Sequence, residues 1–227
     1  MTSPGPRIAL IHATPLAVEP VQSAFRRHWP AAVRMNLLDD TLSADRAAAG
    51  RLTQQMVDRF LALTRYAIGT GCEGILFTCS AFGPAIDAAA RLAGRPTLKP
   101  NEAMFEQALA LTPRTGTLKA GLLATFEASL PSMEHELQAM ATARGALVDL
   151  RKVFVPDAMR DLAQGRLGEH HRRIAEAAQA LQDCDVVMLA QFSMAAARDE
   201  VQRGLPCPVL ASPDCAVLAL HERILHG

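Results

Sequence analysis

Cys79 is the residue of this chain whose type and setting most readily suggest chemistry. It ends a short apolar run in GILFTCSAFG, residues 74–83, where small and hydroxyl-bearing residues follow. The backbone N–H groups of Ser80 and Ala81 are expected to open a helix, and a helix N-terminus attracts anions and lowers the pKa of a nearby thiol. The segment therefore predicts a Cys79 thiolate beside a cradle for a carboxylate. The alternative is a small buried side chain, since free cysteine is among the most buried residue types.

Gln191, Phe192 and Ser193 hold the corresponding place in the second half of the chain. The segment GILFTCSA aligns with VVMLAQFS at an offset of 112 residues, which matches Gln191 with Cys79. Glutamine does not exchange a proton at a useful pKa, but its amide can donate hydrogen bonds to a carboxylate or to a developing enolate. The alternative for Gln191 and Ser193 is a pair of helix-capping residues. The site is therefore expected to be chemically one-sided.

Polar residues also follow the first expected strand of each half. His12 and Thr14 come at the end of the run RIALIHA, and Thr125 and Ser129 follow the run LKAGLLA. Hydroxyl groups at such positions would help to bind an anion, and His12 could relay a proton. The alternative for His12 is a structural residue whose ring is hydrogen-bonded, as polar groups at a buried strand end usually are.

Three other polar segments are predicted to be structural. Asp39 and Asp40, after the second expected strand, are expected to cap a helix or form a lid hinge rather than to act as acid or base. His170 and His171 lie in GEHHRRIAEAAQ, which is typical of a solvated helix start, and adjacent residues do not share a helix face for metal binding. GTGCEG, residues 69–74, matches G-x-G-x-x-G but precedes a strand, the reverse of the dinucleotide-binding order.

The elements that must position these residues alternate along the chain. Apolar runs of strand length are separated by stretches with helical spacing, such as residues 50–71. Strands that alternate with helices predict parallel βαβ units and sheets covered on both faces. The runs occupy residues 7–13, 31–38, 74–79, 95–99, 118–124, 146–153, 185–190 and 207–212.

The second half of this series repeats the first. Besides the pair around Cys79, RPTLKPNEA aligns with CPVLASPDC at an offset of 112 residues, and Ala13-Thr14 aligns with Ala124-Thr125 at 111. Three anchors at nearly one offset predict two structurally similar halves, roughly residues 1–112 and 113–225.

These patterns predict an α/β fold of two pseudo-symmetric lobes, each with a four-stranded, mostly parallel sheet flanked by helices. The first lobe is expected to span residues 1–100 and about 213–227, and the second about 101–212. Active sites of open parallel sheets lie beyond the carboxyl ends of the strands. The pseudo-two-fold arrangement therefore predicts an active-site cleft between the lobes.

Composition limits the partners and the location. Lys and Arg number 23 and Asp and Glu number 23, so no net field attracts nucleic acid or an anionic membrane. The chain shows no leader pattern and no apolar run of the ~20 residues that a membrane span needs. Five cysteines without a CxxC pair predict free thiols, with neither a disulfide framework nor a metal site. We expect a cytoplasmic protein that binds a small molecule. The oligomeric state is left open, with a homo-oligomer as one alternative.

The chain resembles the aspartate/glutamate/hydantoin racemase superfamily, whose relatives include arylmalonate decarboxylase and maleate isomerase. The resemblance covers nearly the whole chain and rests on IHATP, NLLDDTL, FTCSAFG, LLATFEASL, MLAQFSMA and PVLASPDCAV. It implies a two-lobe enzyme without a cofactor, in which one cysteine from each half flanks the α-carbon of the substrate. By this resemblance Cys79 takes the role of the first cysteine, Ser80 and Ala81 those of carboxylate-binding residues, and Thr125 that of a threonine contacting the substrate.

The departure from the family pattern is Gln191, which stands where the second cysteine belongs. A two-base racemase needs a proton donor on the face opposite its base. A single cysteine suits one-sided chemistry, such as protonating an enediolate after decarboxylation or adding to an unsaturated acid. The single-cysteine decarboxylases of the superfamily, by the same resemblance, keep the cysteine of the second half, whereas this chain keeps the first.

The sequence thus predicts a cofactor-independent racemase or isomerase in which Cys79 transfers a proton at the α-carbon of a small carboxylic acid or amino-acid derivative. A single-cysteine decarboxylase or lyase is the second choice. A non-catalytic small-acid binding protein and a redox-sensing thiol are the remaining alternatives. The residues expected to hold the carboxylate and stabilise the enediolate are Thr14, Ser80, Ala81, Thr125, Gln191, Phe192 and Ser193.

Overall fold

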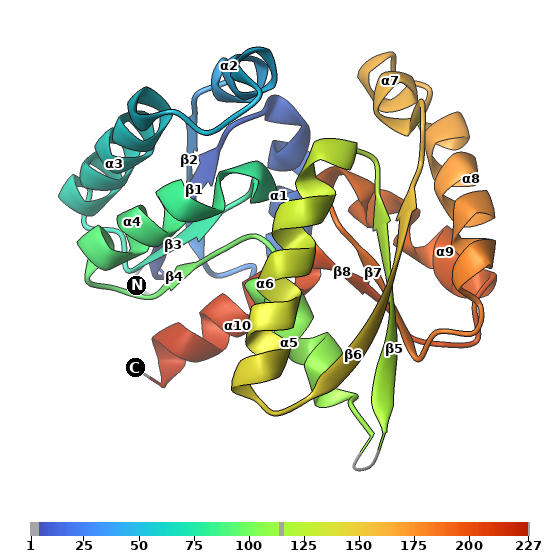
Figure 1. Cartoon of the computed structure of the whole chain (residues 1–227). Coiled ribbons are helices and arrows are strands. Elements are labelled where there is room, and N and C mark those ends of the chain that lie inside the picture. Colours follow the sequence, from blue (N-terminus) through green and yellow to red (C-terminus); the bar gives the residue numbers. More distant parts are fainter. Residues whose placement is uncertain (1–4, 114–115, 227) are drawn as a thin grey trace. The chain divides into compact units, whose positions relative to one another are not determined.

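The computed structural model describes residues 5–113 and 116–226. The chain divides into two compact units, one built from Met1–Pro100 and Ala216–Gly227 and the other from Asn101–Cys215. Each unit carries a four-stranded sheet with parallel strand pairing and helices against it (Figure 1). The predicted α/β class and the two parallel sheets are confirmed.

The first unit has the strand order β2-β1-β3-β4. Its central strands β1 and β3 are almost completely buried, as the continuous apolar runs of a doubly covered parallel sheet require. The strands are β1 (Arg7–His12), β2 (Val33–Leu38), β3 (Gly74–Phe77) and β4 (Thr97–Leu98), and the helices are α1 (Val18–His28), α2 (Leu42–Ala49), α3 (Gln54–Gly69) and α4 (Gly83–Ala93).

Helices cover both faces of this sheet. α3 and α4 lie side by side in Figure 1 and pack on the face that carries the side chains of Ile75 and Phe77. On the other face, the ring of Trp29, the residue directly after α1, stacks on His221 of α10 (Ser212–Leu225), with ring centroids 4.4 Å apart. A Cβ at Gly74 would come within 2.6 Å of the Ile224 side chain, so glycine lets α10 pack directly against β3.

An aromatic cluster fixes the segment that follows β3. The ring centroid of Phe60 lies 5.7 Å from that of Phe77 and 4.9 Å from that of Phe82. Phe82 is fully buried and ends the short 3₁₀ turn η2 (Ser80–Phe82). Cys79 therefore stands between two aromatic anchors, which restricts the backbone on both sides of it.

The second unit has the strand order β6-β5-β7-β8, the same topology as the first. α8 and α9 pack on one face of its sheet, and α5 and α6 contact each other, β6, β7 and β8. The strands are β5 (Thr117–Ala124), β6 (Leu147–Phe154), β7 (Val186–Leu189) and β8 (Val209–Ala211), and the helices are α5 (Glu102–Ala110), α6 (Leu130–Ala143), α7 (Ala158–Ala163), α8 (Leu167–Ala178) and α9 (Arg198–Arg203).

Backbone hydrogen bonds show the internal repeat directly. The N–H of Thr78, just after β3, donates to the Ile11 carbonyl at 3.1 Å. The N–H of Ala190, just after β7, donates to the Leu123 carbonyl at 2.8 Å. Ala190 and Leu123 each lie 112 positions after Thr78 and Ile11, so the repeat holds at this offset for the central strand pair of each sheet.

This register corrects one predicted correspondence. At an offset of 112 the counterpart of Thr125 is Ala13, not Thr14 as the alignment of Ala13-Thr14 with Ala124-Thr125 predicted. That alignment followed two identical residue types, whereas backbone pairing fixes the register of parallel strands, in which a one-residue slip turns every side chain to the other face.

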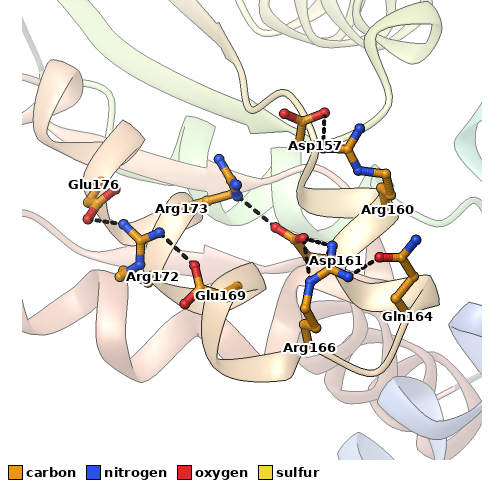
Figure 2. A network of polar contacts seen from close by, with 9 residues as sticks. All are labelled: Asp157, Arg160, Asp161, Gln164, Arg166, Glu169, Arg172, Arg173 and Glu176. Carbon is orange, nitrogen blue, oxygen red and sulfur yellow. Dashed lines mark hydrogen bonds and ion pairs between the residues drawn. The ribbon is translucent and has the colours of Figure 1, made fainter.

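Charged side chains hold α7 to α8 (Figure 2). The Asp161 side chain is buried, and its carboxylate accepts hydrogen bonds from Arg166 Nε at 3.0 Å and from Arg173 Nε at 2.6 Å. The hydrogen bonds from Arg166, opposed by burial and aided by Arg173, hold the pKa of Asp161 below its usual range. Two arginines therefore pair with one carboxylate that is almost completely buried.

His170 is fully buried, which corrects the predicted solvated helix start at His170 and His171. Neither ring nitrogen of His170 has a hydrogen-bond partner among the described residues, and its ring lies edge-on to that of His171. His170 shares the inner face of α8 with Ile174, four residues later. Burial, together with the charge of His171 and against that of Asp161, lowers the pKa of His170 to about 4.

The burial of His170 predicts a loss of stability in mild acid. Its pKa falls from 6.5 to about 4 on folding, so between these values the unfolded chain takes up a proton that the folded protein does not. Above pH 6.5 the His170 side chain does not change the free energy of unfolding. As the pH falls from 6.5 to about 4, it lowers that free energy by about 3 kcal/mol. Urea denaturation at about pH 7 and about pH 4.5 measures the loss.

The matched variants are His170→Leu on the inner face of α8 and His135→Leu at an exposed position of α6. His170→Leu should reduce the acid-dependent loss, and His135→Leu should keep it. The same loss in both variants would contradict the assignment to His170.

Candidate active site

Cys79 lies just beyond the carboxyl end of β3, in extended backbone, directly before η2. It is the only partly exposed cysteine of the five, all of which are in the described part of the chain, and the other four are buried. The strand end is where the sequence predicted this residue. The helix expected immediately after it is a single 3₁₀ turn, and α4 begins only at Gly83.

Burial raises the pKa of Cys79 above its ordinary value of 9.0, whereas the backbone N–H of Ala81 and the hydroxyl of Ser43 tend to lower it. These two groups offset only part of the rise. The prediction that Cys79 is a thiolate at neutral pH is therefore wrong, because a pKa above 9.0 leaves it as a thiol. A single 3₁₀ turn offers little helix dipole, so loss of water around the sulfur dominates.

Ser43 was not found by sequence reasoning, and tertiary contacts explain its place. It is the second residue of α2, and its hydroxyl donates to the Ala13 carbonyl at 2.7 Å. Its only signal in the sequence is a hydroxyl residue shortly after the segment NLLDDTL. The sequence does not reveal that the start of α2 contacts the segment that follows β1.

A charged cluster holds the start of α2 in place. Arg59 of α3 donates to both carboxylate oxygens of Asp39, at 2.7 and 2.5 Å, and to Asp45 Oδ2 at 2.5 Å. Asp39 also accepts from the N–H and the hydroxyl of Thr41. Burial tends to raise the pKa of Asp39, but the contacts with Arg59 and Thr41 lower it overall. Asp39 is therefore held by an ion pair and by Thr41, with no side-chain capping bond to α2, and Asp40 is exposed.

His12 is fully buried at the end of β1 and uses both ring nitrogens within its own unit. Nε2 lies 3.0 Å from Asn36 Oδ1, which can only accept, so Nε2 carries the proton. Nδ1 then accepts from the Thr78 hydroxyl at 2.8 Å. Burial lowers the pKa of His12 against the raising effect of the Asn36 hydrogen bond. The alternative of a structural, hydrogen-bonded histidine accounts for both ring nitrogens. Through them His12 on β1 is bonded to Asn36 on β2 and to Thr78, the residue between β3 and Cys79.

Gln191 is engaged inside the second unit. Its amide oxygen accepts from the Thr125 N–H at 2.8 Å and from the Thr125 hydroxyl at 3.2 Å. Its amide nitrogen donates to Ser129 Oγ at 2.9 Å, and the Ser129 hydroxyl donates to the Phe126 carbonyl at 2.8 Å. The amide therefore joins the segments after β5 and β7 and leaves one N–H for another acceptor. It makes no capping bond to η5 (Phe192–Ala197), so the capping alternative does not describe it.

The remaining predicted binding residues follow the carboxyl ends of strands within their own units. Thr14 is partly exposed, and its hydroxyl accepts from the N–H of Leu16 at 3.4 Å. Ser80 is also partly exposed, whereas Phe192 and Ser193 are almost completely buried. The described contacts form two separate groups, one around Cys79 in the first unit and one that joins Gln191 to Thr125 and Ser129 in the second unit.

In the described ranges, no three His, Cys, Asp or Glu side chains gather as they would to hold a metal ion. No helix in the same ranges combines the length and the apolar character that crossing a membrane requires.

Comparison with known proteins gives one family and several similar folds. The model of the family described as Asp/Glu/Hydantoin racemase matches residues 11–220. No curated protein matches the chain by sequence. Glutamate racemase RacE1 from Bacillus anthracis has a similar structure, with a TM-score of 0.74 and 15% identity over 98% of this chain and 83% of that one.

Two further structures are similar. Allantoin racemase from Klebsiella pneumoniae gives a TM-score of 0.70 with 18% identity over 97% of this chain and 88% of that one. A glycine-to-cysteine variant of arylmalonate decarboxylase, with sulfate ion, gives 0.64 with 16% identity over 98% and 94%. At these identities the structures support the fold alone.

The exposure and the pKa of Cys79 predict its alkylation behaviour. Because the thiolate is the nucleophile and the other cysteines are buried, iodoacetamide should modify Cys79 first, at a rate that still rises with pH above 9.0. Peptide mass spectrometry over a pH series measures both the position and the rate. A rate that is already half-maximal at neutral pH would show a resting thiolate and contradict the assignment.

The contacts of Gln191 predict a stability effect. Gln191→Ala leaves the N–H of Thr125, a residue that is 4% exposed, without an acceptor. An unsatisfied buried donor costs about 1–3 kcal/mol, which urea denaturation should detect. Gln179→Ala is the matched control in the same unit, because the exposed Gln179 amide makes one bond to a backbone carbonyl. Equal losses in the two variants would show that Gln191 has no special structural role.

Proposed function

The chain belongs to the Asp/Glu/Hydantoin racemase family, and from this premise we propose that it is an enzyme in which Cys79 transfers a proton at the α-carbon of a small carboxylic acid without a cofactor. The observation that carries the proposal is the setting of Cys79. It is the one partly exposed cysteine of the five, and it follows the carboxyl end of a central parallel strand.

In the racemase form of the proposal, the Cys79 thiolate removes the α-proton. The electron pair of the C–H bond moves into the carboxylate to give an enediolate, and a proton returns to the opposite face. Gln191 cannot return that proton, so solvent must do so. The remaining N–H of Gln191 and the hydroxyl of Ser80 are the donors assigned to the enediolate oxygens, together with Thr14, Thr125 and Ser193.

A decarboxylase is the second candidate, and the resting thiol favours it. In this form the bond from the α-carbon to one carboxylate breaks, CO₂ leaves, and the electron pair forms the enediolate. The Cys79 S–H then protonates the α-carbon, and water restores the thiol. The raised pKa of Cys79 suits this direction, because the first task of the cysteine is to give a proton rather than to take one.

Charge at the strand ends favours substrates whose side chain carries no acidic group beyond the carboxylates on the α-carbon. Arg59 is paired with Asp39 and Asp45, and Lys99 forms an ion pair with Asp87 at 2.7 Å. Phe126 after β5 and Phe154 at the end of β6 are each 36% exposed. The substrate proposed here is therefore an acid with an apolar substituent rather than aspartate or glutamate.

The test is α-proton exchange in D₂O, followed by NMR over a panel of amino acids, hydantoins, arylacetic acids and substituted malonates. We expect exchange or CO₂ loss on at least one member, reduced at least about 100-fold in Cys79→Ser, which is the typical contribution of a positioned acid or base. Cys207→Ser, which changes a buried cysteine before β8, is the matched control and should keep the activity.

The stereochemistry of the product separates the two forms. Exchange with inversion that depends on Cys79 identifies a racemase, and CO₂ loss with one handedness identifies a decarboxylase. If no member of the panel turns over in a Cys79-dependent way, the enzyme proposal fails and a small-acid binding protein takes its place.

A further inference from the structure

β6 is the longest edge strand of the two sheets. It stands at the end of the strand order of the second unit, so one of its sides has no strand beside it in the described chain (Figure 1). It has eight residues, whereas β2, its counterpart at the edge of the first sheet, has six. An edge strand presents a row of unpaired N–H and C=O groups to which another chain can add. β6 is therefore a candidate docking surface.

A backbone hydrogen bond fixes which groups of β6 face outward. The N–H of Val155, just after β6, donates to the Ala124 carbonyl of β5 at 2.8 Å. In a strand the N–H and C=O of alternate residues point to opposite sides, so the odd-numbered residues of β6 turn these groups to β5. The residues that turn them outward are Val148, Leu150 and Lys152.

The side chains on one face of β6 are self-complementary. Their order along the strand is apolar, acidic, basic and apolar, given by Leu147, Asp149, Arg151 and Val153. A second copy of the strand can lie antiparallel with its Leu150 opposite Leu150. Asp149 then lies opposite Arg151 of the second copy, and Leu147 lies opposite Val153 of the second copy. A two-fold axis repeats both pairs, as a symmetric dimer requires.

We propose that β6 pairs antiparallel with β6 of a second copy of this chain, about a two-fold axis at Leu150, and joins two sheets into one. Val148, Leu150 and Lys152 make the backbone hydrogen bonds in this register, and Asp149 and Arg151 lie between them. Side chains at such non-hydrogen-bonded pairs approach most closely, with Cα atoms about 4.5 Å apart. The outward backbone groups and the charge order therefore favour the same register.

The exposure and contacts of these side chains fit such a dimer. Leu147 is 65% exposed, and Val153 of the second copy would cover it. Asp149 is exposed and makes no hydrogen bond or ion pair with the described residues. Arg151 binds Asp183 through both terminal nitrogens, and its guanidinium has further N–H donors. An exposed carboxylate thus meets a base that can bind a second acid.

Charged residues on an edge strand can also prevent pairing, and β2 is an example. Its one charged residue is Arg34, so antiparallel pairing of two β2 strands brings no opposite charges together. β6 differs because Asp149 and Arg151 carry opposite charges two positions apart. On its other face, Lys152 is already paired with Glu134 of α6 at 2.5 Å, so it brings no unpaired positive charge to the second copy.

The proposal does not rest on the proposed function, and its test measures the mass of the full-length protein in solution. Sedimentation velocity over a series of micromolar concentrations should show a reversible dimer. Asp149→Arg replaces two attractive pairs by two repulsive ones, so it should raise the dissociation constant of the dimer at least about tenfold. Far-UV circular dichroism checks that each variant is folded.

A charge exchange isolates the contact between the two copies. The double variant with Asp149→Arg and Arg151→Asp restores opposite charges across the axis, and it should return the dissociation constant to within about threefold of that of the unchanged protein. It also breaks the ion pair with Asp183, an exposed contact that contributes little to folding. Asp199→Arg changes an aspartate on α9 whose side chain is 91% exposed, and this matched control should leave the dimer unchanged.

Three outcomes would overturn the proposal. A monomer at every concentration would show that the charges on β6 protect the edge from pairing. A dimer that Asp149→Arg leaves unchanged would show that the copies meet through another surface. A dimer that Asp149→Arg weakens and the double variant does not recover would show that Asp149 and Arg151 do not face each other across the axis. Substrate turnover enters none of these results, so failure here is distinct from failure of the enzyme assignment.

Discussion

The parallel pairing of a fully buried central strand with its neighbour, β1 with β3 and β5 with β7, is the constraint on which the rest of the structure depends. The pairing continues one residue past each strand, through Thr78 N–H to Ile11 and Ala190 N–H to Leu123. Cys79 and Gln191 are each the next residue along. Since the side chains of a strand alternate between its faces, this register decides which way these two side chains point.

Most of the fold could be predicted from the sequence because its signals are local and repeated. Short apolar runs bounded by helical stretches identify central strands of a parallel sheet, and the repeat near 112 residues predicts that the second sheet copies the first. The position of Cys79 followed from the same pattern, since the apolar run GILF ends just before it. A local sequence pattern does not show which distant segment packs against the end of a strand. Ser43 on α2 therefore remained unseen.

Two expectations failed where residue type was given more weight than environment. His170 was assigned to a solvated helix start because charged residues surround it, yet it lies four residues before Ile174 on the inner face of α8. The Cys79 thiolate was expected from a helix N-terminus. A single 3₁₀ turn follows instead, and the withdrawal of water from the sulfur outweighs the donors that reach it.

The two units differ in the hydrogen bonds made by the residue at the equivalent position, which is Cys79 in the first unit and Gln191 in the second. In the second unit the amide of Gln191 satisfies the Thr125 N–H, the Thr125 hydroxyl and Ser129, so its hydrogen-bonding capacity mostly serves the fold. In the first unit the counterpart of Thr125 is Ala13, and Cys79 needs no such partner because a thiol donates and accepts only weakly. A thiol that bonds only weakly to its surroundings can change its protonation state with little effect on the strands around it. At this position the second unit therefore has an amide that joins the segments after β5 and β7, whereas the first unit has a thiol whose protonation state can change.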